Sequence, residues 1–196
     1  MRAMNPRLLA STYALIFVAE IPGKTTFASF LMASRARPRP VFVGAAAAFV
    51  LHTAIAVAAG SVIGLLPARA VHVFVGLLFS GLAVMMWREN LEETAEKGFS
   101  AQKRFASTAG TAFGVIFFAQ WGDPTQLATA ALAAKYRAPG PVFVAATLAL
   151  WTVSGLAVLG GHYSKGKIDP RMLQKISALV FAAVGLALLV DTLRTH

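Results

Sequence analysis

The sequence contains no cysteine and, for its length, few charged residues. Of its 196 residues, 13% are charged and 57% are hydrophobic, whereas a water-soluble domain has about 25% charged residues. The absence of cysteine excludes disulfide bonds, thiolate metal ligands and cysteine nucleophiles. Together with a mean hydropathy of +0.67, this composition argues against a disordered chain and against an ordinary soluble domain, and it indicates a membrane protein.

Acidic residues are scarce, with 8 Asp and Glu against 18 Lys and Arg and a net charge of +10. Most basic residues stand in short clusters between long apolar runs, which is how membrane proteins place cations near lipid headgroups. The chain has no basic stripe or basic helix face, so no nucleic-acid partner is expected. It also has no Ser-His-acid or His-rich metal arrangement within the apolar runs, so we do not expect an enzyme.

Six apolar runs are long enough for membrane helices, which need about 20 residues to cross the hydrocarbon core. The runs are continuous rather than alternating, and this favours helices over barrel strands. The first run is not interpreted as a cleaved signal peptide, because Glu20, Pro22 and Lys24 stand where small residues are expected. The predicted spans are residues 8–34, 41–66, 70–88, 107–135, 141–162 and 172–193.

The two halves of the sequence resemble each other. The matching segments are residues 17–20 with 117–120, Thr25 with Thr125, and residues 41–43 with 142–144. Each half contains three predicted helices, and an odd number makes the second half enter the membrane from the opposite face. We therefore expect an all-α membrane protein with six transmembrane helices, built as two inverted three-helix repeats.

The repeats are assigned to residues 1–88 and 107–196, with a linker at 89–106. Four glutamates of the linker fall on one face of a short helical pattern, which fits a solvated linker or a patch that collects cations. The linker side of the membrane carries eleven basic loop residues against six on the other side. By the positive-inside rule the linker is cytoplasmic and both termini lie outside. We expect a multi-pass protein of a bacterial inner (plasma) membrane.

Two acidic residues, Glu20 and Asp123, fall well inside predicted spans. An ionised acid in the membrane interior costs several kcal/mol unless it is paired, hydrated or bound to a cation. A structural alternative is an ion pair between Glu20 and Lys24, four residues later. Asp123 has no basic neighbour in the sequence, which weakens this alternative for the second acid.

Each of the two acids stands beside glycine and proline, in the segments 20–26 and 120–126. Proline removes a backbone donor, and glycine allows the backbone to open. These residues predict broken membrane helices that expose carbonyl groups beside protein or a wet cavity. Carboxylate, amide, hydroxyl and carbonyl oxygens together suit Ca²⁺, Mn²⁺ or Mg²⁺ rather than soft metals.

These residues carry a family resemblance. The sequence resembles the Gdt-type family of small membrane proteins, calcium/manganese-proton antiporters of the lysine-exporter superfamily, whose signature is two copies of E-x-G-D-[KR]-[ST]. Residues 119–136 resemble the second copy, and Ala19-Glu20 with Lys24-Thr25 resembles the first. The departures are Pro22 for Gly and Gly23 for Asp in the first copy, and Gln120 for Glu and Pro124 for the basic residue in the second.

The resemblance implies a secondary transporter that exports Mn²⁺ or Ca²⁺ in exchange for protons, with no cofactor besides the transported cation. Glu20 and Asp123 are expected to bind metal and protons in alternation, and Gln120, Thr25 and Thr125 to add neutral oxygens. The further candidates for the transport site are Lys24, Thr26, Gln126 and His52. The expected partners are the lipid bilayer, the metal ion and protons, and a homo-oligomer is left open.

Two alternatives remain open from the sequence. The first is an exporter of a small organic cation such as a basic amino acid, as in the wider superfamily. The second is a non-transporting membrane scaffold, because only two of the four motif carboxylates of the family remain. His52 admits both a proton-relay role and a hydrogen-bonded packing role.

Overall fold

The structure is a computed structural model, and it describes residues 6–21, 23–88 and 109–163 together with residues 179, 182–183, 185–187 and 189–190. Every regular element in this part of the chain is an α-helix. The expected all-α class is therefore confirmed for the described residues. The predicted linker at 89–106 and most of the predicted span at 172–193 lie outside them.

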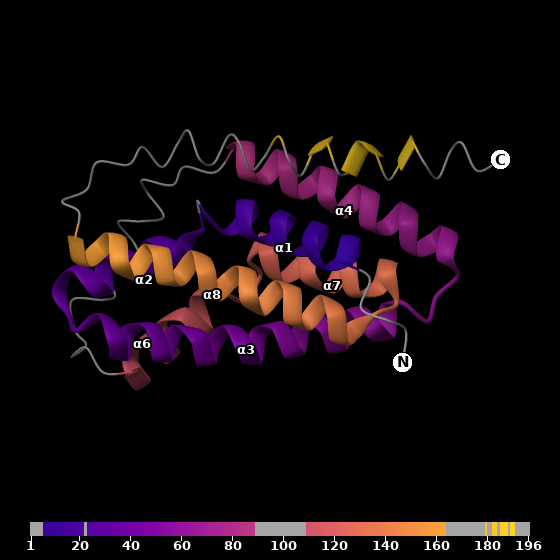
Figure 1. The fold of residues 1–196 in the computed structure, drawn as a ribbon. Coiled ribbons are helices and arrows are strands. Elements are labelled where there is room, and N and C mark those ends of the chain that lie inside the picture. Colours follow the sequence, from indigo (N-terminus) through magenta and orange to yellow (C-terminus); the bar gives the residue numbers. More distant parts are fainter. Residues whose placement is uncertain are drawn as a thin grey trace.

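Seven helices have defined bounds in the described part of the chain, besides the helical residues between 179 and 190 (Figure 1). They are α1 (Pro6–Glu20), α2 (Lys24–Arg35), α3 (Pro38–Ile63), α4 (Ala68–Arg88), α6 (Ala109–Ala119), α7 (Pro124–Tyr136) and α8 (Pro139–Tyr163). The helices α3 and α7 carry proline in their first turn, where its missing N–H has no helical partner to lose. Arg137, with φ of 48°, adopts the left-handed conformation that ends α7.

Two described helices, Pro38–Ile63 in α3 and Pro139–His162 in α8, are long and apolar enough to cross a membrane. A third span is added if α1 and α2 are counted as one bent span. The shorter apolar helices are Ala68–Val84 and Ala109–Ala119. The membrane class is thus supported by these helices, while the number of six spans stays a prediction.

The helices α6 and α7 are separated by a short break and are called a broken pair here, as are α1 and α2. The broken pair α6–α7 runs in the same direction as α3. A Cβ atom on Gly44, near the start of α3, would overlap the carbonyl oxygen of Ala109 at the start of α6. Towards the other end, a Cβ atom on Gly60 would overlap the carbonyl oxygen of Ala130 in α7. Only glycine allows such close approach of two backbones. The end of α3 is therefore held against α7, and its start against α6.

The broken pair α1–α2 runs in the same direction as α8. The hydroxyl of Tyr13 in α1 donates to Thr152 Oγ1 at 3.1 Å, and a Cβ atom on Gly161 would overlap the carbonyl oxygen of Phe30 in α2. Between the two long helices, Trp151 Nε1 donates to Ala46 O at 3.1 Å.

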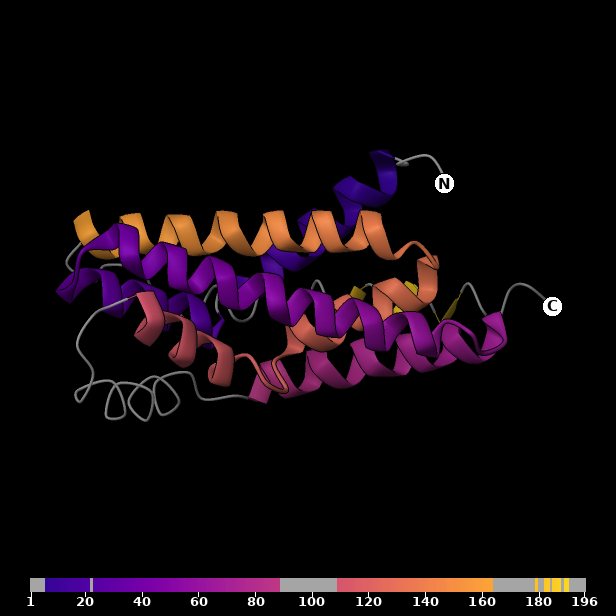
Figure 2. The same ribbon diagram turned by 90° about the horizontal axis from the view of Figure 1, so that it is seen from below.

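The long helices α3 and α8 lie side by side (Figure 2). Ala46 of α3 meets Trp151 of α8, whereas the earlier Phe42 faces the later Gly155, so the two helices run antiparallel. The pair α1–α2 runs parallel to α8, and the pair α6–α7 runs parallel to α3. Because α3 and α8 are antiparallel, the two broken pairs run in opposite directions.

One pair of close backbone contacts repeats with the sequence. The internal alignment pairs Gly60 with Gly161 and Phe30 with Ala130. In the structure Gly60 meets Ala130, and Gly161 meets Phe30. Each glycine therefore touches the repeat counterpart of the residue that the other glycine touches. The long helix of each half packs on the broken helix pair of the other half.

The outer faces of the long helices are apolar. Leu148, Leu156 and Leu159 on α8 are exposed, whereas Ala149 and Val153 on the same helix are buried. Exposed leucines along a helix that is long enough to cross a bilayer fit a lipid-facing surface. At one side of the bundle, α4 packs against described residues near the C-terminus, where Gly185 lies against Ser80 (Figure 1).

Candidate functional site

The site is built on two helix breaks at equivalent positions of the two halves. In the first half, α1 ends at Glu20 and α2 begins at Lys24. In the second half, α6 ends at Ala119 and α7 begins at Pro124. Both breaks close with the same short turn: Gly23 N donates to Glu20 O at 2.8 Å, and Asp123 N donates to Gln120 O at 3.1 Å. The breaks predicted from glycine and proline are therefore confirmed by the helix ends.

Both acids at these breaks are buried. Glu20 is 0% exposed and Asp123 is 6% exposed. Asp123 caps α7, since its Oδ2 accepts a hydrogen bond from Thr125 N at 3.1 Å, and a carboxylate at this position also faces the positive end of the helix dipole. Glu20 is the last residue of α1 and points its carboxylate at the first turn of α2, where Thr25 Oγ1 donates to Glu20 Oε1.

The hydroxyl of Thr125 joins the two acids. Its Oγ1 lies 2.8 Å from Glu20 Oε2 and 2.7 Å from Asp123 Oδ2. The two carboxylate oxygens are therefore closer than the sum of these distances. They lie within the separation of about 6 Å that allows one hard cation to contact both, given Ca²⁺–oxygen distances of about 2.3–2.6 Å.

Gln120 occupies the position equivalent to Glu20 and completes the cluster from the second half. It is 1% exposed, and its Nε2 donates to Thr125 Oγ1 at 2.9 Å. Its carbonyl oxygen Oε1 is buried without a hydrogen-bond partner. A buried unpaired acceptor is costly in a folded protein, and a bound cation is one partner that would satisfy it.

The first break contributes two hydroxyl groups. Thr25 is fully buried against Glu20, and Thr26 Oγ1 donates to the backbone oxygen Glu20 O at 2.6 Å. Thr26 therefore stabilises the break, while Thr25 contacts the carboxylate. The side chain of Lys24 lies outside the described residues, so its predicted pairing with Glu20 stays untested.

His52 and Gln126 lie next to the cluster and bond mainly to each other and to the backbone. Gln126 Nε2 lies 3.0 Å from His52 Nδ1, and His52 Nε2 lies 2.7 Å from Phe117 O. Within the described residues no group of three or more His, Asp or Glu side chains could hold a metal ion. A cation at this site would therefore meet two carboxylates and neutral oxygens.

Sequence reasoning did not identify the backbone partners of the site. The carbonyl of Phe117 bonds to the side chain of His52, and the amide of Gly122 donates to the side chain of Gln126. Backbone groups carry no residue-specific signal in a sequence. The only available hint was the helix break itself, because it leaves backbone groups without their helical partners.

The helical bundle, its apolar outer faces and its buried pair of carboxylates together define a membrane transport protein. The divalent cation/proton antiporter family GDT1 matches residues 8–94 and 108–196 of the chain. The chain belongs to this family, which is a family of transporters rather than enzymes. The resemblance drawn from the two motifs is thereby confirmed.

Curated relatives agree with this assignment. The chain is 31% identical over 184 residues to the GDT1-like protein sll0615 of Synechocystis, covering 85% of this chain and 89% of the relative. It is 31% identical over 199 residues to GDT1-like protein 3 of Oryza sativa subsp. indica, covering 88% and 70%. It is 30% identical over 200 residues to GDT1-like protein 3 of Arabidopsis thaliana, covering 88% and 67%. No solved structure matches the chain.

Proposed function

We propose that the protein is a secondary transporter that exports Mn²⁺ or Ca²⁺ in exchange for protons, and that Glu20 and Asp123 bind the cation. The observation that carries the proposal is the shared contact of both carboxylates with the Thr125 hydroxyl. Two buried carboxylates have a charge of −2 when ionised, which matches one divalent cation. Gln120 Oε1, Thr25 and Thr125 supply neutral oxygens of the kind that hard cations accept.

The hydrogen-bond inventory of the cluster supports proton exchange. A hydroxyl group has one hydrogen and two lone pairs. Thr125 accepts from Gln120 Nε2, so its single hydrogen can serve only one of its two carboxylate contacts. The other contact needs its own hydrogen, so the second carboxyl group carries a proton and donates it to the Thr125 hydroxyl oxygen. A divalent cation that binds both carboxylates replaces this proton, which couples cation binding to proton release.

The arrangement of the two halves supports alternating access by an inverted repeat. Glu20 and Thr25 come from the pair α1–α2, which runs parallel to α8. Asp123 and Thr125 come from the pair α6–α7, which runs parallel to α3. The site lies where the two halves meet because each half contributes one carboxylate, and the two helix pairs run in opposite directions as an inverted repeat requires. Rocking of one half against the other would expose such a site to each side of the membrane in turn.

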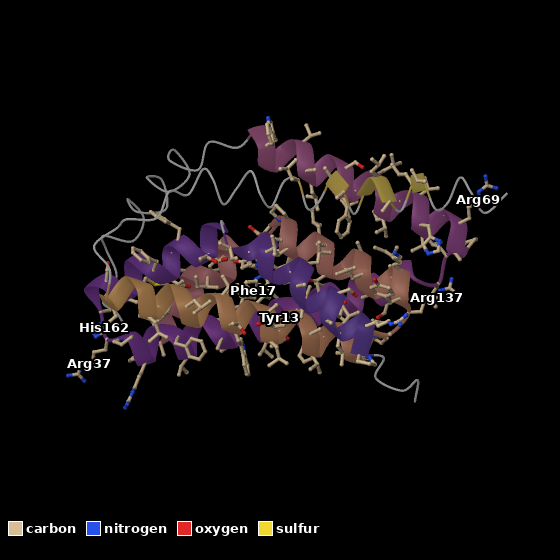
Figure 3. All side chains as sticks on the ribbon, turned by 45° about the horizontal axis from the view of Figure 1, so that its top comes forward. Tyr13, Phe17, Arg37, Arg69, Arg137 and His162 are labelled. Atoms are coloured by element: carbon tan, nitrogen blue, oxygen red, sulfur yellow. The ribbon has the colours of Figure 1, made fainter. Side chains whose placement is uncertain are left out.

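The same inverted arrangement sets the proposed topology. Figure 3 shows Arg37 and His162 at one end of the bundle, and Arg69 and Arg137 at the other. The excess of basic loop residues on the Arg37 side makes this end cytoplasmic in the proposed topology and leaves both termini outside. We place the protein in a bacterial inner membrane.

The test is cation-driven proton flux in proteoliposomes. Purified wild-type protein with an imposed pH gradient is expected to move Mn²⁺ or Ca²⁺ against protons. Glu20→Gln and Asp123→Asn keep the size of the side chains but remove one charge each, so we expect transport to fall by about two orders of magnitude. The loop variants Glu89→Gln and Asp169→Asn make the same chemical changes outside the predicted spans and are expected to behave as wild type.

Other outcomes of this experiment would overturn the proposal. Equal flux in wild type and in both site variants would show that the cluster does not bind the transported ion. Lysine-driven flux without any metal dependence would instead support an organic-cation exporter. A stable protein that neither transports nor binds metal by calorimetry would support a membrane scaffold.

A further inference from the structure

His52 is buried in the middle of α3, at the break between α6 and α7. It is 2% exposed, and its ring packs against one aromatic ring at the end of α6 and one in the break. The ring centroid lies 4.7 Å from that of Phe117 and 5.5 Å from that of Trp121. The residue thus reaches from a long, continuous helix into the segment that carries Gln120 and Asp123.

Both ring nitrogens of His52 are already engaged. The side-chain oxygen of Gln126 accepts from Gly122 N at 3.1 Å, so the amide nitrogen of Gln126 faces His52. His52 Nδ1 is therefore an acceptor, and the ring carries its hydrogen on Nε2, which donates to Phe117 O at 2.7 Å. No lone pair of the ring is left for a cation, which excludes a ligand role in this arrangement.

The bonds of His52 form one continuous chain across the break. They connect α3 to the carbonyl of Phe117 in the last turn of α6, and through Gln126 to the first turn of α7 and to Gly122 within the break. Gly122 adopts a φ of +73°, which other residues rarely tolerate. Gln126 directly follows Thr125, whose hydroxyl holds both carboxylates. The chain therefore ends beside the cation cluster.

At the first break, the residue equivalent to His52 forms no such bond. The carbonyl of Phe17, the counterpart of Phe117, accepts from the backbone amide of Ile21 at 3.2 Å. The repeat counterpart of His52 is Val153 in α8, whose side chain is buried and cannot form a hydrogen bond. The two halves share their helix breaks and the equivalent contacts of Gly60 and Gly161, whereas the His52 link belongs to the second break.

We propose that His52 is a positioning residue that fixes the break of the second half to α3 and so holds Asp123 and Thr125 at the right distance from Glu20. This inference rests on the proposed function for its effect on transport, but not for its effect on the break itself. At the first break, the described bonds come from the backbone turn and from the threonines at the start of α2, rather than from a long helix.

The test compares three variants in the full-length protein. His52→Val places at this position the residue that its repeat counterpart already carries, and removes both bonds. His52→Gln keeps a terminal N–H that can reach Phe117 O. Tyr13→Phe removes an interhelical hydrogen bond of similar length between α1 and α8, which involves no residue of the second break, and serves as the matched control.

The first measurement is backbone amide hydrogen exchange of residues 120–126 in detergent or nanodiscs. Loss of a buried hydrogen bond commonly changes a local equilibrium by about tenfold. We expect exchange in this segment to rise about tenfold in His52→Val, and to stay within about threefold of wild type in His52→Gln and Tyr13→Phe. Equal exchange in His52→Val and Tyr13→Phe would overturn the inference, whatever the transport assay shows.

The second measurement is the concentration dependence of cation transport. A displaced half-site binds the cation less well, so His52→Val is expected to raise KM about tenfold and to change kcat by less than about threefold, with recovery in His52→Gln. An unchanged KM with a lower unfolding temperature would show that His52 only packs, and would overturn the inference. If wild type itself moves no cation, the proposed function falls, and the exchange comparison still decides the positioning role.

Discussion

The hydroxyl of Thr125 is where the two halves of the chain meet chemically. It contacts Glu20 from the first half, and Asp123 and Gln120 from the second. Thr25, its repeat counterpart, contacts only Glu20 among the side chains of the cluster. The two threonines occupy equivalent sequence positions, yet one of them joins the carboxylates and the other does not. This difference arises because each half retains a different acid.

We therefore predict that Thr125→Val weakens cation transport much more than Thr129→Val. Valine has the same shape as threonine but leaves the neighbouring buried oxygens without their shared partner, at a cost of about 1–3 kcal/mol. We expect KM for the cation to rise at least about tenfold. Thr129 Oγ1 bonds only to the backbone oxygen of Thr125 at 2.7 Å, so its valine variant should stay within about twofold. Equal KM values in the two variants would contradict the role given to Thr125.

Gln120 offers a gain-of-function prediction. Its carbonyl oxygen is buried without a partner, and Gln120→Glu would add a third carboxylate to the cluster. At an effective dielectric constant near 20, one more charge about 4 Å from a cation contributes several kcal/mol before desolvation is subtracted. We expect at least about tenfold tighter cation binding by calorimetry, with more protons released per cation. Weaker binding in this variant would show that Gln120 faces away from the cation.

At the scale of the elements, helix packing depends on glycines that touch a neighbouring backbone. A Cβ atom on Gly60 would overlap Ala130 O, and one on Gly161 would overlap Phe30 O. Since backbone atoms cannot move aside as a flexible side chain can, the helices themselves must separate. The contacts are equivalent in the two halves, so the long helices α3 and α8 carry the same kind of constraint.

We predict that Gly60→Ala and Gly161→Ala destabilise the protein by similar amounts, about 1–3 kcal/mol each. Gly81 in α4 is the matched control, because a Cβ atom there meets nothing within 4 Å. Gly81→Ala should be neutral or stabilising by up to about 1 kcal/mol, since alanine favours the helix. Thermal unfolding followed by tryptophan fluorescence in detergent measures all three. Similar behaviour of Gly60→Ala and Gly81→Ala would refute the packing argument.

At the scale of the whole molecule, the chain presents two ends with different basic residues. Arg37 lies at one end, and Arg69 and Arg137 lie at the other (Figure 3). Arg137 Nη2 donates to Leu66 O at 2.7 Å, which joins the turn after α7 to the turn after α3. This bond joins the two halves at the end of the bundle where Arg137 lies.

The topology can be tested directly because the chain contains no cysteine. A single Arg37→Cys variant is expected to react with a membrane-impermeant maleimide only from the cytoplasmic side, in inverted vesicles. Arg69→Cys is expected to react only from the outside, in intact cells. Each variant is the control for the other. Labelling of both positions from the same side would contradict the proposed orientation and the assignment of α3 as a complete span.

Much of the candidate site could be predicted from residue types alone. Glu20 and Asp123 stood out because charged groups are costly inside a membrane, and the neighbouring glycine and proline predicted the two helix breaks that the structure contains. The family was recognised from the same motifs and is confirmed. The number of six spans is still a prediction, since two of the described helices satisfy the criteria of length and apolarity individually.

The sequence by itself determined the membrane class, the helical elements and the positions of their breaks, because hydropathy and backbone propensity act over neighbouring residues. Only the tertiary structure decided which polar groups meet. Glu20 and Thr125 are 105 positions apart in the chain, and His52 reaches Phe117 across 65. Such contacts depend on how closely the helix backbones approach and on which face each helix turns inward, and no local pattern in the sequence specifies either.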